Sequence, residues 1–197
     1  LVDSLCLRPP PRPWTRYTVE RHVAELHAAL DSLGPITLVG PSLGALLAVA
    51  YAARHRKQVE NLVLIGMPYF GSEEAACGDL RSGVLLVMIA CILTRRVFGW
   101  LLPYVRRDIP REVAEDLVKH TWRSSTSSLW EVVYRYDAAD ELRRLSEQTQ
   151  ILMIHGQNDD IAPFAAIKQL ADEQPGATLI ALDGLDHHPF LRTPHTC

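Results

Sequence analysis

Four short, uninterrupted runs of apolar residues divide the chain. Each run lacks the alternation of apolar and polar residues that a strand with one wet face shows, so we expect strands whose two faces are both covered. Such strands are typical of a parallel sheet that lies between layers of helices. The four runs are Ile36–Val39, Leu62–Ile65, Ile151–Ile154 and Thr178–Leu182.

Between these runs the apolar spacing changes to that of helices. Residues 19 to 33 are predicted to form a helix with one buried face, because apolar residues recur there at intervals of four and three positions. Gly34-Pro35 is expected to end it, and we expect surface or boundary positions for His22 and His27. Two further helices are predicted at Leu43–Arg56 and Pro163–Glu173.

This order of elements predicts a single α/β domain over residues 1–197, with a mostly parallel sheet covered by helices on both faces. The rhythm breaks between Gly71 and Gln148, and residues 72–148 are too long for a simple connection. Helix formers and aromatic residues in this insertion predict a helical cap between strands of the core. Its apolar run Gly83–Leu93, bracketed by arginines, is shorter than the roughly 20 residues that a membrane span needs.

That run has three interpretations. It can be a buried helix of the cap, the wall of an apolar substrate pocket, or a contact with a membrane surface, and the last is not favoured.

The first apolar run leads into Gly40-Pro41-Ser42-Leu43-Gly44, which has the pattern Gly-x-Ser-x-Gly. At a sharp turn from strand to helix, small residues two positions before and after the serine let the two elements approach closely. The turn places the Ser42 hydroxyl above the carboxyl edge of the sheet and directs the Leu43 N–H toward it. This context predicts a nucleophilic serine, and an ordinary helix N-cap is the competing interpretation.

An acid and a base follow in the loops after the third and fourth runs. A serine hydroxyl needs a base within hydrogen-bond reach and an acid that orients the base. The carboxyl ends of parallel strands converge on one crevice. We therefore expect Ser42 to be the nucleophile, Asp159 the acid and His187 the base. Their neighbours Asp160 and His188 are the alternatives for the last two roles.

Together these motifs resemble the α/β-hydrolase-fold serine hydrolases, in the broad group of esterases and lipases. The resemblance implies that Ser42 attacks the acyl carbon of a carboxylic ester, that the Leu43 N–H stabilises the oxyanion, and that an acyl-enzyme forms. It implies no cofactor and no metal. The matching motifs are the elbow at residues 38–44, the strand at 62–65, the acid loop His155-Gly156-x-x-Asp159 with Pro163, and the histidine loop His187-x-Pro189 with Pro194.

Three features depart from the pattern of that superfamily. Pro41 stands beside the serine, where proline is unusual and removes a backbone donor. The first strands and the loop that donates a second oxyanion N–H would lie before Leu1, and the closing helix is cut short at Cys197. We therefore expect a chain truncated at its N-terminus and shortened at its C-terminus, with an open edge at the first strand and poor catalysis. The alternative function is a non-catalytic or fragmentary module that lacks a complete oxyanion hole.

Composition narrows the remaining classes of function. The 197 residues are 48% hydrophobic and 22% charged, and 20 basic against 23 acidic residues give a formal charge of −3. No basic stripe with interleaved aromatic residues is present, so we expect no nucleic-acid partner. The four cysteines are scattered and lack metal-ligand spacing, which favours a reduced, cytoplasmic protein. The expected partner is a small-molecule ester or acyl substrate, with an apolar part favoured by the cap.

Overall fold

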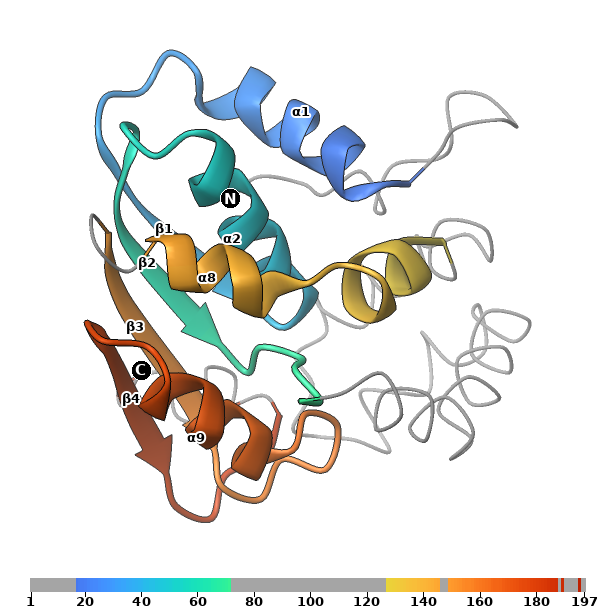
Figure 1. Ribbon diagram of the computed structural model, residues 1–197, viewed down its shortest axis with the longest axis vertical. Coiled ribbons are helices and arrows are strands. Elements are labelled where there is room, and N and C mark those ends of the chain that lie inside the picture. The colour runs from blue at the N-terminus through green and yellow to red at the C-terminus, as the bar shows by residue number, and fades with distance from the viewer. Residues whose placement is uncertain (1–16, 72–126, 146–148, 188, 190–194, 196–197) are drawn as a thin grey trace.

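The fold is built on a sheet of four parallel strands in the order β1-β2-β3-β4 (Figure 1). The computed structural model describes residues 17–71, 127–145, 149–187, 189 and 195. Each of the four apolar runs lies within one strand, so the predicted strands are confirmed. The strands are β1 (Ile36–Pro41), β2 (Val59–Ile65), β3 (Gln150–Gly156) and β4 (Ala177–Leu182).

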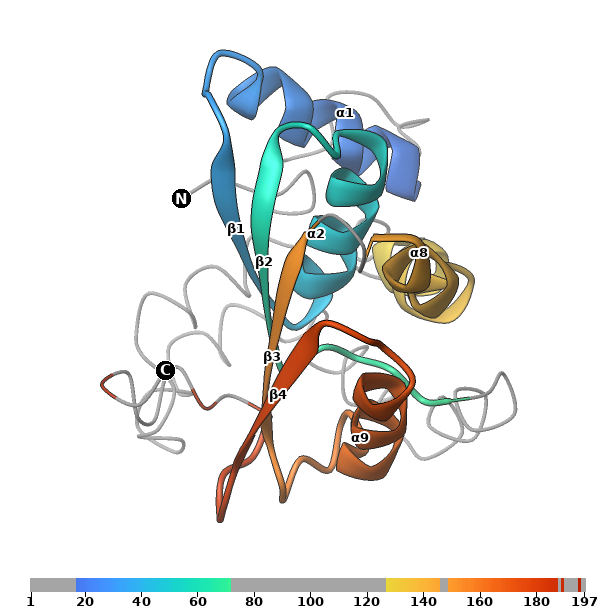
Figure 2. The ribbon, with the colours of Figure 1, turned by 60° about the vertical axis from the view of Figure 1, so that its left-hand side comes forward.

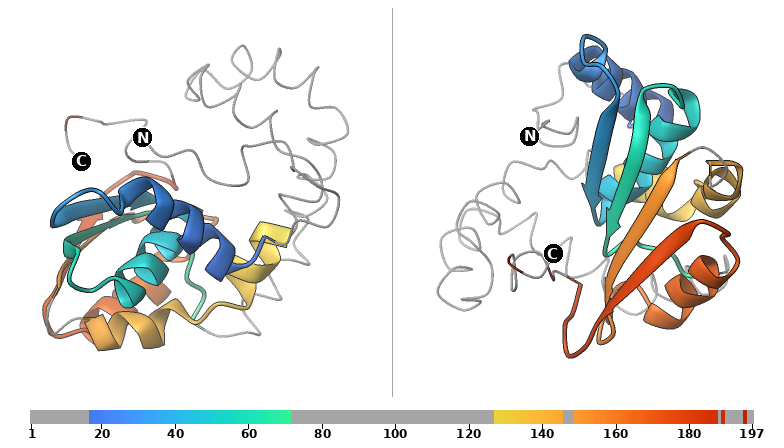
Figure 3. Two further views of the ribbon diagram at one scale, coloured as in Figure 1. Left: turned by 90° about the horizontal axis from the view of Figure 1, so that it is seen from above. Right: turned by 90° about the vertical axis from the view of Figure 1, so that its left-hand side faces the viewer.

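Helices of the described residues cover one face of this sheet, as Figures 2 and 3 show. The predicted helices are confirmed, although the first ends three residues earlier than expected. The side-chain amide of Gln58 donates to the carbonyl of Leu30 at 2.6 Å and to that of Leu33 at 3.2 Å, which satisfies groups at the helix end. The helices are α1 (Val19–Leu30), α2 (Leu43–Arg54), α8 (Ala138–Leu145) and α9 (Phe164–Asp172), and the π-helical segment η2 (Leu129–Tyr134) precedes α8.

Helix α2 is the centre of the helical layer. Every residue from Ala45 to Ala52 is at most 4% exposed. A helix that is apolar all round must be surrounded by other elements, and α1, η2 and α8 pack around α2 while its remaining side contacts β1 and β2. Because alanine is frequent in this helix, its neighbours can approach closely. The burial of α2 fixes the position of the turn that precedes it.

The face of the sheet that points away from these helices is also apolar. Side chains alternate between the two faces of a strand, and on this second face Ile65, Ile154 and Leu182 form a small buried cluster. Val39 and Ile180 on the same face are 55% and 40% exposed. The parallel sheet with flanking helices is therefore confirmed, and within the described ranges the helices lie on one face.

The predicted insertion at residues 72–148 is described in part. Residues 72–126, with the run Gly83–Leu93, lie outside the described residues, as do residues 1–16 and the four cysteines. The cap therefore stays a prediction. Helix α8, near the end of the insertion, packs on α2 as part of the core layer. Within the part of the chain that the structure describes, no helix has the length and apolar character to cross a bilayer.

His22 lies in the core, so the prediction of a surface or boundary position was wrong. Its side chain is 2% exposed, and its Nε2 lies 3.2 Å from the hydroxyl oxygen of the buried Ser128. The pair joins α1 to the residues just before η2. His22 stands three positions after Val19 and four before Leu26, on the apolar stripe itself, and that spacing was a signal for burial. His27 is at the boundary, as predicted.

We predict that His22 makes the fold sensitive to acid. Burial lowers the pKa of His22 to about 4, against a smaller opposing effect of Glu25. In the unfolded chain the pKa is about 6.5, so the unfolded state binds more protons between these values. The stabilisation is complete above pH 6.5 and is lost as the pH falls toward 4. Between pH 7 and 4 the free energy of unfolding should fall by about 3 kcal/mol more in the wild type than in His22→Gln.

Urea unfolding at the two pH values measures this difference. Ala24→Gln introduces the same side chain at an exposed position of α1 and should keep the pH dependence of the wild type. An equal loss of stability in His22→Gln and the wild type would contradict the prediction.

Candidate active site

Ser42 occupies the turn between β1 and α2 in a strained backbone conformation. Its φ of +50° and ψ of −126° lie in a region that residues other than glycine rarely adopt, and among the described residues no other non-glycine has a positive φ. The Ser42 N–H donates to the carbonyl of Ile65 at 2.8 Å, which anchors the turn to β2. Its hydroxyl makes no capping hydrogen bond at α2. The N-cap interpretation is therefore not supported.

The glycines around Ser42 are required by close contact between strand and helix. A Cβ atom on Gly40 would overlap the backbone carbonyl of Gly44, and one on Gly44 would lie 3.3 Å from the ring of Pro41. Pro41 fits here because consecutive backbone nitrogens of a strand point to opposite sides. The Ser42 N–H points to β2, so the nitrogen of Pro41 points to the other side of β1. Within the described residues that side is a sheet edge, and the strand pairing loses no donor there.

Asp159 lies in the loop after β3, where its carboxylate is surrounded by donors. Its Oδ1 accepts the N–H groups of Ile161 at 2.9 Å and Ala162 at 2.8 Å. Its Oδ2 lies 2.8 Å from Nδ1 of His187 and 3.1 Å from Nε2 of His155. Burial raises the pKa of Asp159, but hydrogen bonds from His155, His187 and the Ala162 N–H together hold it well below its usual range.

His187 completes the arrangement from the loop after β4. Its side chain is 5% exposed, and its Nε2 lies 2.8 Å from Oγ of Ser42. Ser42, His187 and Asp159 are therefore brought together as the sequence predicts. Asp160, the alternative acid, is exposed, and His188 lies outside the described residues.

Two glycines let the histidine loop sit against its neighbours. Gly66 follows β2 with a φ of +57°, and a Cβ atom there would lie 2.8 Å from the carbonyl oxygen of His187. A Cβ atom on Gly156 would overlap the carbonyl oxygens of Leu185 and Asp186. The sequence did not predict these two roles, although Gly66 directly after one apolar run and Gly156 two positions after another were the available signal.

The family comparison fits this geometry. A model of the alpha/beta hydrolase family matches the chain over residues 1–197. The chain belongs to the alpha/beta hydrolase family.

The chain is also similar to individual proteins. It is 29% identical over 191 residues to a pimeloyl-[acyl-carrier protein] methyl ester esterase of Aromatoleum aromaticum, covering 87% of this chain and 76% of the relative. It is 30% identical over 181 residues to 2-hydroxymuconate semialdehyde hydrolase of Pseudomonas putida, and the match covers 83% of this chain and 60% of the relative. The crystal structure of a hydrolase from Pseudomonas aeruginosa matches its fold with a TM-score of 0.73 at 20% identity. The match covers 98% of this chain and 74% of the hydrolase.

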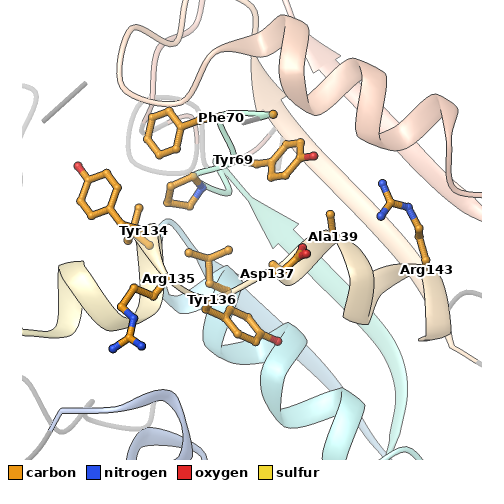
Figure 4. Close-up of a pocket in the computed structure, with 13 residues that line it drawn as sticks. Tyr69, Phe70, Tyr134, Arg135, Tyr136, Asp137, Ala139 and Arg143 are labelled. Atoms are coloured by element: carbon orange, nitrogen blue, oxygen red, sulfur yellow. The ribbon is translucent and has the colours of Figure 1, made fainter. Parts of the chain in front are cut away.

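A pocket of about 300 Å³ lies beside helix α2 (Figure 4). Its walls come from the residues after β2, from the end of η2, the joining segment and α8, and from Leu46 on α2. Phe70 and Tyr134 stack across it with ring centroids 6.1 Å apart. Arg143 at its rim is paired with Glu173 at 2.9 Å. The side chains of the Ser42 site do not line this pocket, which is a neighbouring feature that the sequence did not predict.

Leu43 is the first residue of α2, so its N–H belongs to the end of the helix where backbone donors lack partners within the helix. Its part in an oxyanion hole stays a prediction. In the described ranges, no group of three or more His, Cys, Asp and Glu side chains is arranged to hold a metal ion.

We predict that the close contacts at Gly40 and Gly156 make alanine costly at both positions. Each new methyl group would overlap backbone carbonyl oxygen, which cannot move without displacing the elbow or the histidine loop. Gly40→Ala and Gly156→Ala should each lower the free energy of unfolding by about 2 kcal/mol or more, as measured in urea.

Gly34→Ala is the matched control, because a Cβ atom at Gly34 meets no atom within 4 Å. Its effect should stay within about 0.5 kcal/mol. Equal stability of all three variants would show that the elbow and the loop tolerate a side chain.

Proposed function

We propose that this α/β hydrolase is a serine hydrolase that cleaves a carboxylic ester or a related acyl compound. The observation that carries the proposal is the chain of hydrogen bonds from Ser42 through His187 to Asp159, with both heavy-atom distances at 2.8 Å. Such a chain matches what a serine needs to become a nucleophile, namely a base in contact with it and an acid behind that base.

The direction of proton transfer follows from the ionised state of Asp159. A carboxylate can only accept, so Nδ1 of His187 carries a hydrogen and its Nε2 is left to accept the Ser42 proton. As Oγ attacks the acyl carbon, the proton passes to Nε2 and the carbonyl oxygen becomes an oxyanion. The Leu43 N–H is the proposed donor to that oxyanion. Collapse of the intermediate breaks the bond to the alcohol, which takes the proton from Nε2.

A water molecule completes the cycle. His187 Nε2 takes a proton from the water as its oxygen attacks the acyl-enzyme, and the released Ser42 oxygen then recovers that proton. Asp159 stabilises the imidazolium in both halves of the reaction, and the low pKa of its carboxyl keeps it ionised at neutral pH. No cofactor enters these steps.

An ester is the proposed substrate class because one relative is named as a methyl ester esterase. An apolar acyl or alcohol part is proposed from the composition of the segment around Gly83–Leu93. The alternative is a non-catalytic or fragmentary module without a complete oxyanion hole. A folded protein whose Ser42 does not react would favour that alternative.

Ser42 is predicted to react with a fluorophosphonate probe, since the hydroxyl is held against its base. Peptide mapping of the labelled protein should place the modification on Ser42, and Ser42→Ala should abolish both labelling and hydrolysis of p-nitrophenyl butyrate. Ser32→Ala, at an exposed position before β1, should label like the wild type. Undiminished labelling in Ser42→Ala would end the assignment.

His187, rather than His188, is predicted to be the base. The Nε2 of His187 lies 2.8 Å from Oγ of Ser42, which supports His187 in this role. His187→Ala should lower the rate of hydrolysis by a factor on the order of 10³ or more, whereas His188→Ala should keep most of it. Steady-state kinetics of the two variants separate the roles, and the reverse ranking would move the base by one residue.

A further inference from the structure

His155 is a buried histidine that the proposed reaction does not use. It lies in β3, is 1% exposed, and points its ring toward the loop that carries the acid. Its Nε2 lies 2.9 Å from the carbonyl oxygen of Ala162 and 3.1 Å from Oδ2 of Asp159. A carbonyl oxygen only accepts, so Nε2 carries a hydrogen. That single N–H is therefore shared between a backbone carbonyl and the carboxylate.

We infer that His155 is a positioning residue for the acid of the proposed triad, because its Nε2, which also bonds the Ala162 carbonyl of the loop, lies 3.1 Å from Oδ2 of Asp159. This inference rests on the proposed function. The carboxylate cannot rotate freely, since Oδ1 accepts the N–H groups of Ile161 and Ala162 while Oδ2 meets both histidines. His155 thereby fixes the oxygen that His187 contacts.

A second consequence is electrostatic. Oδ2 divides its negative charge between two N–H donors, and this division limits how strongly it stabilises a protonated His187. Without the His155 donor, Oδ2 would interact more strongly with the N–H of His187 alone. The acid limb of the profile that relates Ser42 reactivity to pH would then move to higher pH. A histidine that served packing alone would not move this limb.

The ionisable groups near Asp159 and the two histidines are the same in the wild type and in the His155 variants described below. Asp159 is the acid that contacts both rings, Asp160 next to it is exposed, and Asp186 next to His187 is half-buried. None of these changes in the variants below, so their charges contribute equally to every profile. The ring of Phe164 lies 6.3 Å from that of His155 and carries no charge.

Two substitutions separate the donor from the ring. His155→Phe keeps an aromatic ring and removes the donor, whereas His155→Gln removes the ring and keeps an N–H that can meet both oxygens. The readout is the second-order rate constant for fluorophosphonate labelling of Ser42, measured from pH 5 to 9, because it does not require the natural substrate. Hydrolysis of p-nitrophenyl butyrate supplies KM and kcat in parallel.

We expect His155→Phe to label Ser42 about 10-fold more slowly or worse at neutral pH. Its acid limb should lie at least about 0.5 unit higher, its kcat should fall, and its KM should be unchanged. His155→Gln should restore the position of the limb and most of the rate. His155→Leu, a second donor-free variant, should shift the limb as His155→Phe does.

If the acid limb of His155→Phe and His155→Leu lay at the same pH as that of the wild type, the inference would be overturned. It would also be overturned if His155→Gln behaved like His155→Phe. These outcomes are distinct from failure of the proposed function, which would appear as an unlabelled Ser42 in the wild type.

Discussion

The contact between Gly40 and Gly44 is the constraint on which the rest of the site depends. With a side chain at Gly40, α2 could not lie against the end of β1, and the sharp turn at Ser42 would open. The burial of α2 on nearly all sides holds the helix in that position and maintains the strained φ of the serine. Strain of this kind persists only where the surrounding structure determines it, and here the surrounding structure is the core of the domain.

The same principle of close backbone contact builds the other half of the site. Gly66 and Gly156 let the loop of His187 lie directly on the ends of β2 and β3, and Asn158 binds the carbonyl of Leu185 across that junction. The backbone of His187 is therefore positioned by main chain packed on main chain. Side-chain hydrogen bonds then set the final alignment of the imidazole.

Among the described residues, histidine and backbone N–H groups, rather than Lys or Arg, contact the buried carboxylate of Asp159. Burial penalises the carboxylate, but two backbone N–H groups and two histidine N–H groups surround its oxygens. Hydrogen bonds to a charged group are among the stronger ones, and a set of four offsets the cost of leaving water. The acid is thus at once a buried structural group of the loop before α9 and a member of the proposed triad.

Sequence by itself determined the four strands, the helices α1, α2 and α9 and the motif residues Ser42, Asp159 and His187, because periodicity and turn chemistry are local properties of the chain. Tertiary structure alone decided the environments that depend on distant segments. His22 is buried because Ser128, more than 100 positions later, supplies its partner, and His155 meets the carboxylate because the loop after β3 folds back on the strand. Local patterns cannot reveal which polar groups are brought into one buried cluster, since burial and hydrogen bonding are set by packing between segments far apart in sequence.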